Sequence, residues 1–359
     1  MKTILKSIQS LKKNEWFYYN QTSKNKLKNP FNNDDENNQT LHLNFIKDFF
    51  TSGGKLRVLD DLDIEDFKNN DYVKHTNSVY FLGILIFSQW KLNLSKDEFI
   101  LRLNEREGFD INRFQFMWFL STLFHDLYYK YEEVEEIKRL KEQNIFTYSD
   151  LERYFYINYT IEEDFNENPI PEILSDNISN YVIWKLEKRG KYDHGIIAGM
   201  KLFDELKKNR IEVYQNRYEN LGLNWESKLD IQYYYCAQII KAHNIWFNPG
   251  KDQNYADYGM EGLEINPNIK FQEYPFYYLF CLIDTIDPVK ALKNEIPNVN
   301  DILDSILIEI SKDSLILKND KLEETQFDNI KKKCFGLKEW LDIMVSATET
   351  TINISIPKL

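Results

Sequence analysis

The sequence predicts a mainly α-helical fold followed by a small α+β appendage. Two observations lead to this fold class. From about residue 40 to residue 300, long segments are apolar on one side or all round, which is typical of helices inside an all-α bundle. After residue 300 the segments become short and rich in β-forming residues. The 359 residues, 43% of them hydrophobic, suffice for one large domain with an appendage.

An N-terminal helix and a polar linker are predicted to precede the helical bundle. The pattern predicts an N-terminal helix at about residues 4–19, and the polar, asparagine-rich residues 21–40 predict a loop or partly disordered linker. The helices of the bundle are then expected at residues 78–92, 111–143, 193–209, 229–243 and 274–292. We therefore expect residues 1–69 to form the N-terminal helix and linker, and residues 70–299 to form the all-helical core.

Residues 300–359 form the predicted α+β subdomain. Two β-rich runs within residues 304–320 are separated by the Lys312–Asp313 pair, which predicts a hairpin. A helix at about residues 327–345 follows, and the strict alternation of residues 350–357 predicts a further strand. The subdomain could serve dimerisation or ligand sensing, and nothing in its residues chooses between these roles.

The charge and the cysteines limit the class of protein. A net charge of −12 disfavours broad, nonspecific binding of nucleic acid, although a local basic cleft is compatible with it. Three widely spaced cysteines, without a CxxC pair, form no disulfide framework and fit a reducing cytoplasm. The N-terminus lacks the apolar core of a signal peptide, and no apolar stretch approaches the ~20 residues that span a bilayer. We expect a soluble, cytoplasmic protein without a membrane partner.

The chain has only five histidines, and four of them have an unusual setting. A lone histidine on an apolar segment is more often a hydrogen-bonded core or surface residue than a metal ligand, and a His-Asp pair often arises by chance. Four of the five, however, lie on or beside apolar helical segments, where an unpaired imidazole would be costly to bury. His42 lacks this setting and is interpreted as a surface or core residue.

Six residues on five predicted helices could bring metal-binding groups to the interior. They are His75 just before a helix, His125 and Asp126 in the middle of one, His194 at a helix start, His243 at a helix end, and Asp284 within an apolar helix. Buried imidazoles and carboxylates are tolerated when they bind one another or a metal. Four imidazoles and two carboxylates suffice for two cations. Because no cysteine is in the set, two divalent transition metal ions (Mn, Fe, Co, Ni or Zn) are expected, and Mg is also compatible.

This ordered set resembles the HD-domain superfamily of metal-dependent phosphohydrolases. The minimal H…HD…D signature is supplied by His75, the His125–Asp126 pair and Asp284, and His194 and His243 match the extended form of members with two metals. Such members include HD-GYP cyclic-dinucleotide phosphodiesterases, HD nucleases of CRISPR systems, and the oxygenase branch typified by inositol oxygenase. The resemblance covers roughly residues 70 to 295 and implies an all-helical HD-domain bundle.

The chain departs from the family pattern in several places. The 50 residues between His75 and His125 are more than in compact members, and residues 92–114 are expected to form an extra helix there. Many two-metal members have HDxGK, whereas here Lys130 lies four residues after the Asp, on the same helix face as the third position. Asn244 stands where several branches have a second His. The absence of a GYP sequence argues against a typical cyclic di-GMP enzyme.

The resemblance implies a role for each ligand. His75, His125 and Asp284 would hold the first metal, and His194 and His243 the second. Asp126 would bridge both metals. A water between the two cations would be the nucleophile. Asp126, as the residue that bridges the metals, and Lys130, as a phosphate binder, are the predicted catalytic residues.

Further residues near the predicted ligands have competing interpretations. Arg189 and Lys191, together with Lys130 and Asn244, are predicted to bind substrate, although charge runs such as residues 185–191 are more often solvated faces. For Asp193 a helix N-cap is preferred over an orienting role. For Tyr128 and Tyr129 core packing is preferred over stacking on a base.

Three functions from different classes remain open. The leading one is a phosphohydrolase or phosphodiesterase that cleaves a phosphoester of a nucleotide, cyclic nucleotide or oligonucleotide. The second is a di-iron oxygenase with the same six ligands, and the third is a non-catalytic HD regulatory or binding module. The acidic balance favours a small phosphorylated molecule or nucleotide as substrate over a long nucleic acid.

Overall fold

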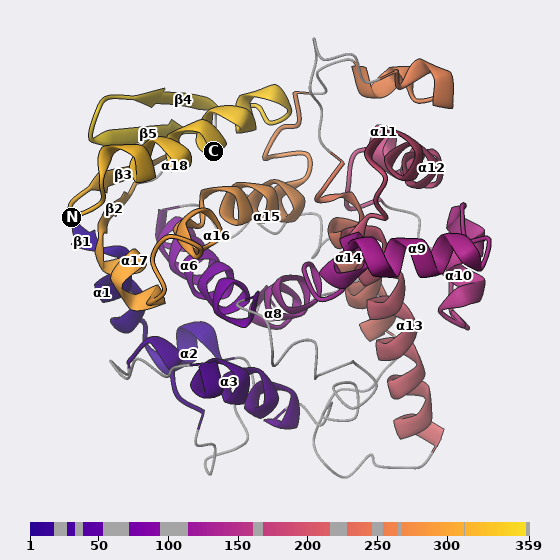
Figure 1. Cartoon of the computed structure of the whole chain (residues 1–359). Coiled ribbons are helices and arrows are strands. Elements are labelled where there is room, and N and C mark those ends of the chain that lie inside the picture. The colour runs from indigo at the N-terminus through magenta and orange to yellow at the C-terminus, as the bar shows by residue number, and fades with distance from the viewer. Residues whose placement is uncertain are drawn as a thin grey trace. The chain divides into compact units, whose positions relative to one another are not determined.

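The computed structural model describes most of the chain, and its ribbon is shown in Figure 1. The described residues are 1–17, 27–32, 39–52, 72–93, 114–160, 168–215, 228–245, 254–264, 268–311 and 313–356. They form two compact units. Unit 1 comprises Met1–Phe49, Lys68–Phe119 and Asn268–Leu359, and unit 2 comprises Phe50–Phe67 and Leu120–Pro267. The predicted fold class, mainly α with a small α+β part at the C-terminal end, is confirmed. The predicted domain boundaries near residues 69 and 299 stay a prediction.

Unit 1 combines helices from both ends of the chain. They are α1 (Ile4–Gln9), α2 (Lys13–Trp16), η1 (Pro30–Asn32), α3 (Gln39–Ser52), α6 (Tyr72–Asn93), the first half of α8 (Phe114–Phe124), α15 (Pro275–Ile286), α16 (Pro288–Leu292), α17 (Val299–Asp304), α18 (Glu324–Gly336) and η7 (Leu337–Glu339). The core is densely aromatic. The indole Nε1 of Trp118 donates to the Tyr80 carbonyl at 3.0 Å, and a Cβ at Gly83 would lie 2.2 Å from the same indole. Only glycine lets α6 accept this ring.

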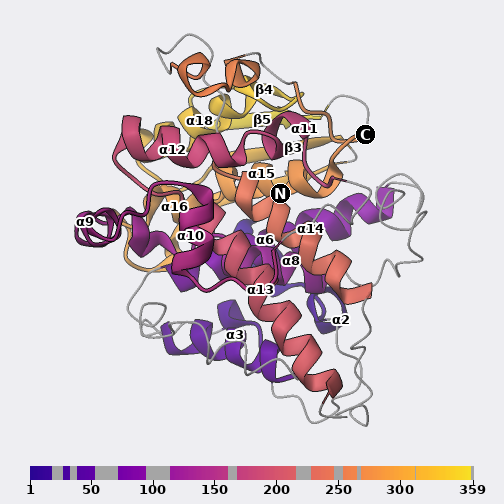
Figure 2. The same cartoon turned by 90° about the vertical axis from the view of Figure 1, so that its right-hand side faces the viewer.

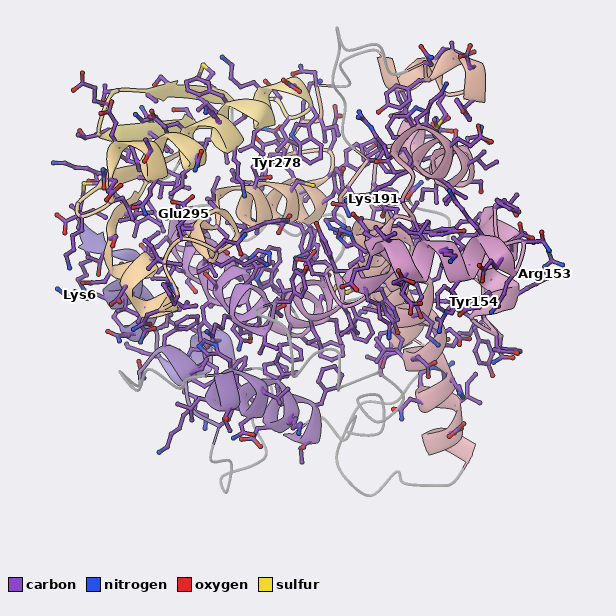
Figure 3. The ribbon with its side chains drawn as sticks, viewed as in Figure 1. Lys6, Arg153, Tyr154, Lys191, Tyr278 and Glu295 are labelled. Carbon is purple, nitrogen blue, oxygen red and sulfur yellow. The ribbon has the colours of Figure 1, made fainter. Side chains whose placement is uncertain are left out.

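The sheet of unit 1 joins the two ends of the chain. Its strands, β1 (Lys2–Thr3), β2 (Ile306–Ile310), β3 (Ser314–Asn319), β4 (Met344–Ala347) and β5 (Thr351–Ser355), are all antiparallel in the order β1-β2-β3-β5-β4. Figure 1 shows the indigo β1 beside the yellow C-terminal strands. The alternating residues Ile306, Ile308, Leu315, Leu317, Ile352 and Ile354 are buried on one face, and α18 packs against β4 and β5. The Tyr278 hydroxyl of α15 (labelled in Figure 3) donates to the Asp342 carbonyl at 2.9 Å, which ties this helix to the same subdomain.

The predicted hairpin and the predicted last strand are confirmed as β2–β3 and β5, but the helix between them is shorter than predicted. Instead of extending to residue 345, α18 ends at Gly336, and Met344 and Val345 belong to β4. Val345 is buried and pairs with Ile354 of β5, so sheet pairing overrides the local helical pattern. The two-residue strand β1 was not predicted.

Unit 2 is built around two long neighbouring helices. Its elements after α8 are η3 (Tyr129–Glu132), α9 (Val134–Glu142), α10 (Tyr148–Tyr154), α11 (Glu172–Ser175), α12 (Ile178–Arg189), α13 (His194–Gln215), α14 (Lys228–Ala242), η5 (Ala256–Tyr258) and η6 (Glu261–Glu264). Figure 2 shows α13 running beside α14, and these helices pack on one another. A Cβ at Gly199 would lie 2.5 Å from the Ala237 carbonyl oxygen, so the close packing of α13 on α14 requires glycine there.

Three predicted helices are broken in the structure. The predicted N-terminal helix is divided into α1 and α2. The predicted helix at 111–143 is interrupted after Phe124, where the Nδ1 atom of His125 lies 2.7 Å from the Thr122 carbonyl oxygen and competes for an acceptor of the helical ladder. The segment 274–292 is divided at Asp287, which is extended because a proline follows it.

Two further findings concern the rest of the chain. Among the described residues, no helix is both long enough and apolar enough to span a membrane. Most of the extra helix predicted at residues 92–114 and most of the linker predicted at 21–40 lie outside the described residues.

Candidate metal sites

The first candidate site lies within unit 2. Asp126, His194 and His243 are buried, and one ligand atom of each lies within 4.8 Å of those of the other two. Asp126 follows the end of α8, His194 is the first residue of α13, and His243 directly follows α14. The Nε2 atom of His194 lies 3.1 Å from Oδ1 of Asp126. A carboxylate and two imidazoles are ligands that suit Zn, Mn, Fe, Co and Ni.

Local packing holds the imidazole of His243 against α13. A Cβ at Gly195 would lie 2.6 Å from the His243 ring and 2.7 Å from the Ile240 carbonyl oxygen. The ring centroids of His194 and His243 are 5.4 Å apart. Glycine at the second position of α13 therefore lets the two histidines approach each other.

The second candidate site lies within unit 1. The Nε2 atom of His75 lies 3.1 Å from Oδ1 of Asp284, and both residues are buried. His75 is the fourth residue of α6, so the prediction that it precedes the helix is wrong. Asp284 lies near the end of α15, and its Oδ2 accepts a hydrogen bond from Lys290 Nζ at 2.6 Å.

The four predicted histidine ligands share one orientation. In each, Nδ1 lies 2.6–2.7 Å from an oxygen that only accepts hydrogen bonds. These oxygens belong to the Asp287 carboxylate for His75, the Thr122 carbonyl for His125, the Glu132 carboxylate for His194 and the Ile240 carbonyl for His243. Nδ1 must therefore carry a proton, and Nε2 is the atom that can bind a metal. His42 differs, because its Nδ1 accepts a hydrogen bond from Asn77 Nδ2 at 3.0 Å.

Two orienting carboxylates were missed at the level of sequence. Glu132 binds His194 at 2.7 Å, and Asp287 binds His75 at 2.7 Å while its other oxygen accepts from the Ser78 hydroxyl. Glu132 stands among other acids that are exposed, so no sequence signal marks it. Asp287 could have been suspected from the following proline, which ends α15 and makes Asp287 the N-cap of α16.

Charge pairs surround the unit 2 site. Lys185 Nζ donates to Glu132 at 3.0 Å and to Asp193 at 2.6 Å. Burial alone would raise the pKa of Glu132, but the hydrogen bond from His194 and the charge of Lys185 lower it to about 2. Burial lowers the pKa of His194, and the hydrogen bonds with Asp126 and Glu132 outweigh burial and raise it to about 9. The pocket of His194 thus favours a positive charge, which a proton or a metal ion could supply.

The predicted N-cap role of Asp193 is confirmed. Its Oδ1 accepts a hydrogen bond from the backbone N–H of Ile196 at 2.9 Å, in the first turn of α13. Its Oδ2 accepts from Lys185, so the same side chain fixes both the helix start and a charge beside His194. The ring centroid of Tyr129 lies 4.4 Å from that of His194, whereas Tyr128 is buried.

The predicted substrate-binding residues have different surroundings. Asn244 Nδ2 lies 2.9 Å from His194 Nε2, and Lys191 Nζ (labelled in Figure 3) lies 3.6 Å from Glu132 Oε2, so both adjoin the unit 2 site. The Arg189 guanidinium lies 5.5 Å from the centroid of the Trp184 ring. Lys130 belongs to the 3₁₀ helix η3, so its predicted position on an α-helix face is wrong. A substrate-binding role for these four residues stays a prediction.

The six predicted metal ligands are divided between the units. His75 and Asp284 lie together in unit 1, and His125, Asp126, His194 and His243 lie in unit 2, with ring centroids of His125 and His243 5.5 Å apart. The prediction that all six form one dinuclear centre draws on both units and stays a prediction.

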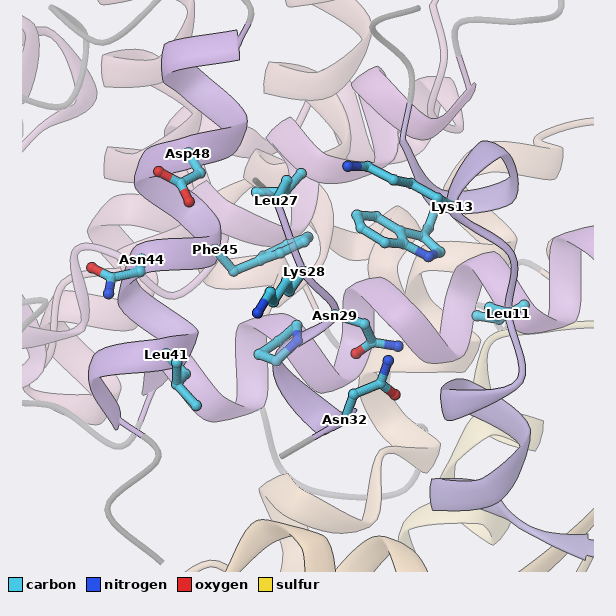
Figure 4. Close-up of a pocket in the computed structure, with 12 residues that line it drawn as sticks. Leu11, Lys13, Leu27, Lys28, Asn29, Asn32, Leu41, Asn44, Phe45 and Asp48 are labelled. Atoms are coloured by element: carbon cyan, nitrogen blue, oxygen red, sulfur yellow. The ribbon is translucent and has the colours of Figure 1, made fainter. Parts of the chain in front are cut away.

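A cavity of about 690 Å³ lies elsewhere in unit 1. As Figure 4 shows, α3 contributes Leu41, Asn44, Phe45 and Asp48 to its lining, with Lys13 on the opposite side. None of the predicted site residues lines it.

Known proteins give no independent guide to these sites. No family model, no curated protein and no solved structure matches the chain.

Proposed function

We propose that this protein is a metal-dependent phosphohydrolase or phosphodiesterase that binds two divalent ions through its buried His and Asp residues. One observation carries the proposal. All four histidines of the predicted ligand set direct Nδ1 at an acceptor oxygen and leave Nε2 for a metal, and His75 and His194 each have a carboxylate oxygen 3.1 Å from Nε2. His42, a buried histidine outside the predicted ligand set, differs because its Nδ1 accepts a hydrogen bond.

Divalent ions at these residues would supply activation of a water and neutralisation of the phosphoryl oxygens. The chain's own residues have other tasks. Glu132 and Asp287 hold the imidazoles of His194 and His75 in one orientation, so these ligands need little rearrangement when an ion binds. The carboxylates of Asp126 and Asp284 lower the cost of placing a cation in a buried position.

The resemblance to HD-domain proteins supports the reaction class. The order H…HD…H…H…D is preserved along the chain, and the helices predicted around His194, His243 and Asp284 are present as α13, α14 and α15. The acidic composition favours a nucleotide or another small phosphorylated molecule as substrate.

A phosphoester screen with purified protein tests the proposal. Its substrates are a chromogenic diester, dNTPs, cyclic dinucleotides, and single-stranded DNA and RNA, each with Mn, Co, Ni, Mg and Zn. We expect metal-dependent turnover that Asp126→Ala abolishes together with metal binding. His42→Gln is the matched control, because it alters a buried histidine whose Nδ1 is an acceptor, and it should retain metal and turnover.

Two results would refute the phosphohydrolase proposal. One is the absence of turnover with every substrate although metal analysis shows a loaded protein. The other is a di-iron spectroscopic signal that responds to substrate under air, which would identify the oxygenase instead. Full activity of Asp126→Ala would refute the site assignment.

A further inference from the structure

Another cavity lies within unit 2, where α9 and α10 end. Its volume is about 620 Å³, which is within the usual range for sites that bind small molecules. Gln143 and Asn144 line it from the end of α9, and Tyr154, Phe155 and Tyr156 line it from the end of α10. Among the described residues that line it, none is a predicted site residue. The cavity is therefore distinct from the candidate metal sites.

Four of the described lining residues are aromatic. The ring of Phe155 is nearly perpendicular to the rings of Tyr131 and Tyr154, with centroids 5.1 and 4.9 Å away and interplanar angles of 87° and 86°. The Tyr154 hydroxyl (Tyr154 is labelled in Figure 3) accepts a hydrogen bond from Arg139 at 2.9 Å, which holds this ring in place. Rings held in this way offer flat apolar surfaces on which a planar ligand can stack.

Tyr156, the fourth aromatic residue, has a backbone conformation that is unfavourable for tyrosine. It follows the C-cap of α10 with a φ of 51°, and the backbone N–H of Ile157 donates to the Glu152 carbonyl at 3.0 Å. Helices that end in this way usually have glycine or asparagine at the left-handed position, as α9 does with Asn144. Tyr156 is 83% exposed, so its ring supports neither the helix end nor the core. A strained residue that adds a ring to a cavity points to a ligand.

The polar groups of the lining select the class of ligand. Gln143 and Asn144 are exposed and carry amide groups, which can pair with the donor and the acceptor on one edge of adenine. Asp150 and Arg153 form an ion pair, so their charges cancel in the lining. A neutral planar ring with donors and acceptors on its edge fits this lining better than a phosphate group does.

The 3₁₀ helix η3 joins this cavity to the unit 2 site. Residues three apart on a 3₁₀ helix share a face, so Tyr129 and Glu132 lie on one side of η3. Both adjoin His194, because the two ring centroids are 4.4 Å apart and Glu132 Oε1 lies 2.7 Å from Nδ1. Tyr131 lies on another side of η3 and lines the cavity. A ligand that moves Tyr131 would therefore also move the groups that hold His194.

We propose that this cavity binds a nucleobase, with adenine as the best match, and that η3 transmits its occupancy to His194. The binding of a nucleobase is independent of the proposed function. The transmission rests on the proposed function, because it assumes a metal ion at His194. Since the charges of the lining cancel, a nucleoside and its monophosphate should bind alike.

Calorimetric titration of the full-length protein with adenosine, in EDTA, tests the cavity without turnover. Tyr156→Gly removes the ring and suits the left-handed backbone, so the variant should stay folded and bind adenosine about tenfold more weakly, as expected for one lost stacking contact. Asn144→Gly removes only the amide and should act in the same direction. Phe146→Asn is the matched control, because Phe146 is exposed and aromatic but is not among the lining residues, and it should bind adenosine as the wild type does.

Two further ligands define what the cavity recognises. Purine riboside lacks the amino group of adenosine and should bind about tenfold more weakly, because the amide that accepts from this group would lose its partner. AMP should bind as adenosine does.

Competition for Zn²⁺ against a chromogenic chelator, with and without adenosine, tests the transmission. Saturating adenosine should change the Zn²⁺ affinity of the wild type at least about fivefold, the lower end of typical couplings between sites. At the same adenosine concentration the change should be smaller in Tyr156→Gly and undiminished in Phe146→Asn.

The outcomes separate this inference from the proposed function. No binding of adenosine, or equal binding by Tyr156→Gly and Phe146→Asn, would overturn the nucleobase site whatever the phosphoester screen shows. Tenfold tighter binding of AMP than of adenosine would refute a site for a neutral ring. Equal Zn²⁺ affinities with and without adenosine would overturn the transmission through η3. If adenosine binds as expected but no phosphoester is cleaved, the proposed function fails and the nucleobase site stands.

Discussion

Glu132 illustrates how one carboxylate can orient a candidate metal ligand, His194. Its Oε1 lies 2.7 Å from His194 Nδ1 and also accepts a hydrogen bond from Lys185, so two partners hold the same oxygen in place. An imidazole whose Nδ1–H is fixed in this way presents Nε2 in one direction and is a stronger ligand. Removal of the charge should therefore weaken metal binding without unfolding the protein.

We predict that Glu132→Gln lowers metal affinity about tenfold or more, the range found for partners of metal-binding histidines. The measurement is competition for Zn²⁺ or Mn²⁺ against a chromogenic chelator. Glu135→Gln, an exposed glutamate in the first turn of α9, is the matched control and should leave affinity unchanged. Equal affinities in the two variants would contradict the orienting role of Glu132.

His42 gives the protein a dependence on pH that is separate from the metal ligands. It is fully buried, and burial, together with the charge of Lys74, lowers its pKa from 6.5 to about 3. Between these values the unfolded chain binds a proton that the folded chain does not. The free energy of unfolding is therefore not reduced by His42 above about pH 6.5, and it falls as the pH is lowered from 6.5 toward 3.

This prediction is checked by urea unfolding of the wild type and His42→Gln at several pH values. Below pH 6.5 the free energy of unfolding of the wild type should fall faster than that of the variant, by up to about 1.4 kcal/mol per pH unit. Other titrating groups contribute to both proteins and cancel in the difference. Parallel pH profiles would show that His42 is not buried in its neutral form.

At the scale of elements, helix existence was easier to predict than helix ends. The long helices α6, α13 and α14 follow from apolar periodicity, and His194 and His243 lie at their predicted helix termini. The break after α8 was not predicted, because apolar periodicity continues through it. A hydrogen bond from the His125 side chain to a backbone carbonyl is invisible to a period count.

The same limits apply to the candidate sites. Residue type and order singled out the six candidate ligands, because buried imidazoles and carboxylates in a chain with few histidines are uncommon; that they bind metal stays a prediction. Glu132 could not be chosen from the many acids of the chain, because its role depends on tertiary distances. For Asp287 the following proline was the one signal in the sequence.

The close packing at the start of α13 predicts that one added methyl group at Gly195 destabilises the protein. In Gly195→Ala the new Cβ would lie 2.6 Å from the His243 ring and 2.7 Å from the Ile240 carbonyl oxygen, so helix or ring must shift. We expect a loss of about 1–3 kcal/mol in the free energy of unfolding, typical of overpacking, together with weaker metal binding. Denaturant unfolding and metal competition measure the two effects.

Gly336→Ala is the control for this substitution. Among the described residues, no atom lies within 4 Å of the position that the new methyl group would take, and φ is −60°. Alanine should therefore be neutral there or stabilise by less than about 1 kcal/mol. If Gly195→Ala were as stable as Gly336→Ala and held metal equally well, the close approach of His243 to α13 would be wrong.

At the scale of the whole molecule, unit 1 is assembled from three separate parts of the chain. Its sheet pairs β1, at the N-terminus, with β2, more than 300 residues later, and α18 covers the same sheet. The sequence predicted the hairpin β2–β3 and the strand β5 but assigned the first residues of β4 to a helix. A two-residue strand such as β1 is too short to show a periodic pattern. The candidate ligands His75 and Asp284 both belong to this composite unit, so its stability and metal binding should be linked.

Metal content provides the test for the molecule as a whole. Two ions per chain are expected by elemental analysis after loading and desalting. His75→Gln removes a candidate ligand of unit 1 and His194→Gln removes one of unit 2, so each should lose one ion. Because bound ions stabilise only the folded state, chelation should also lower Tm, and an ion at 100 times its Kd contributes about 2.7 kcal/mol. A wild type that retains a single ion, or a His75→Gln variant that retains two, would rule out a second metal at the His75–Asp284 pair.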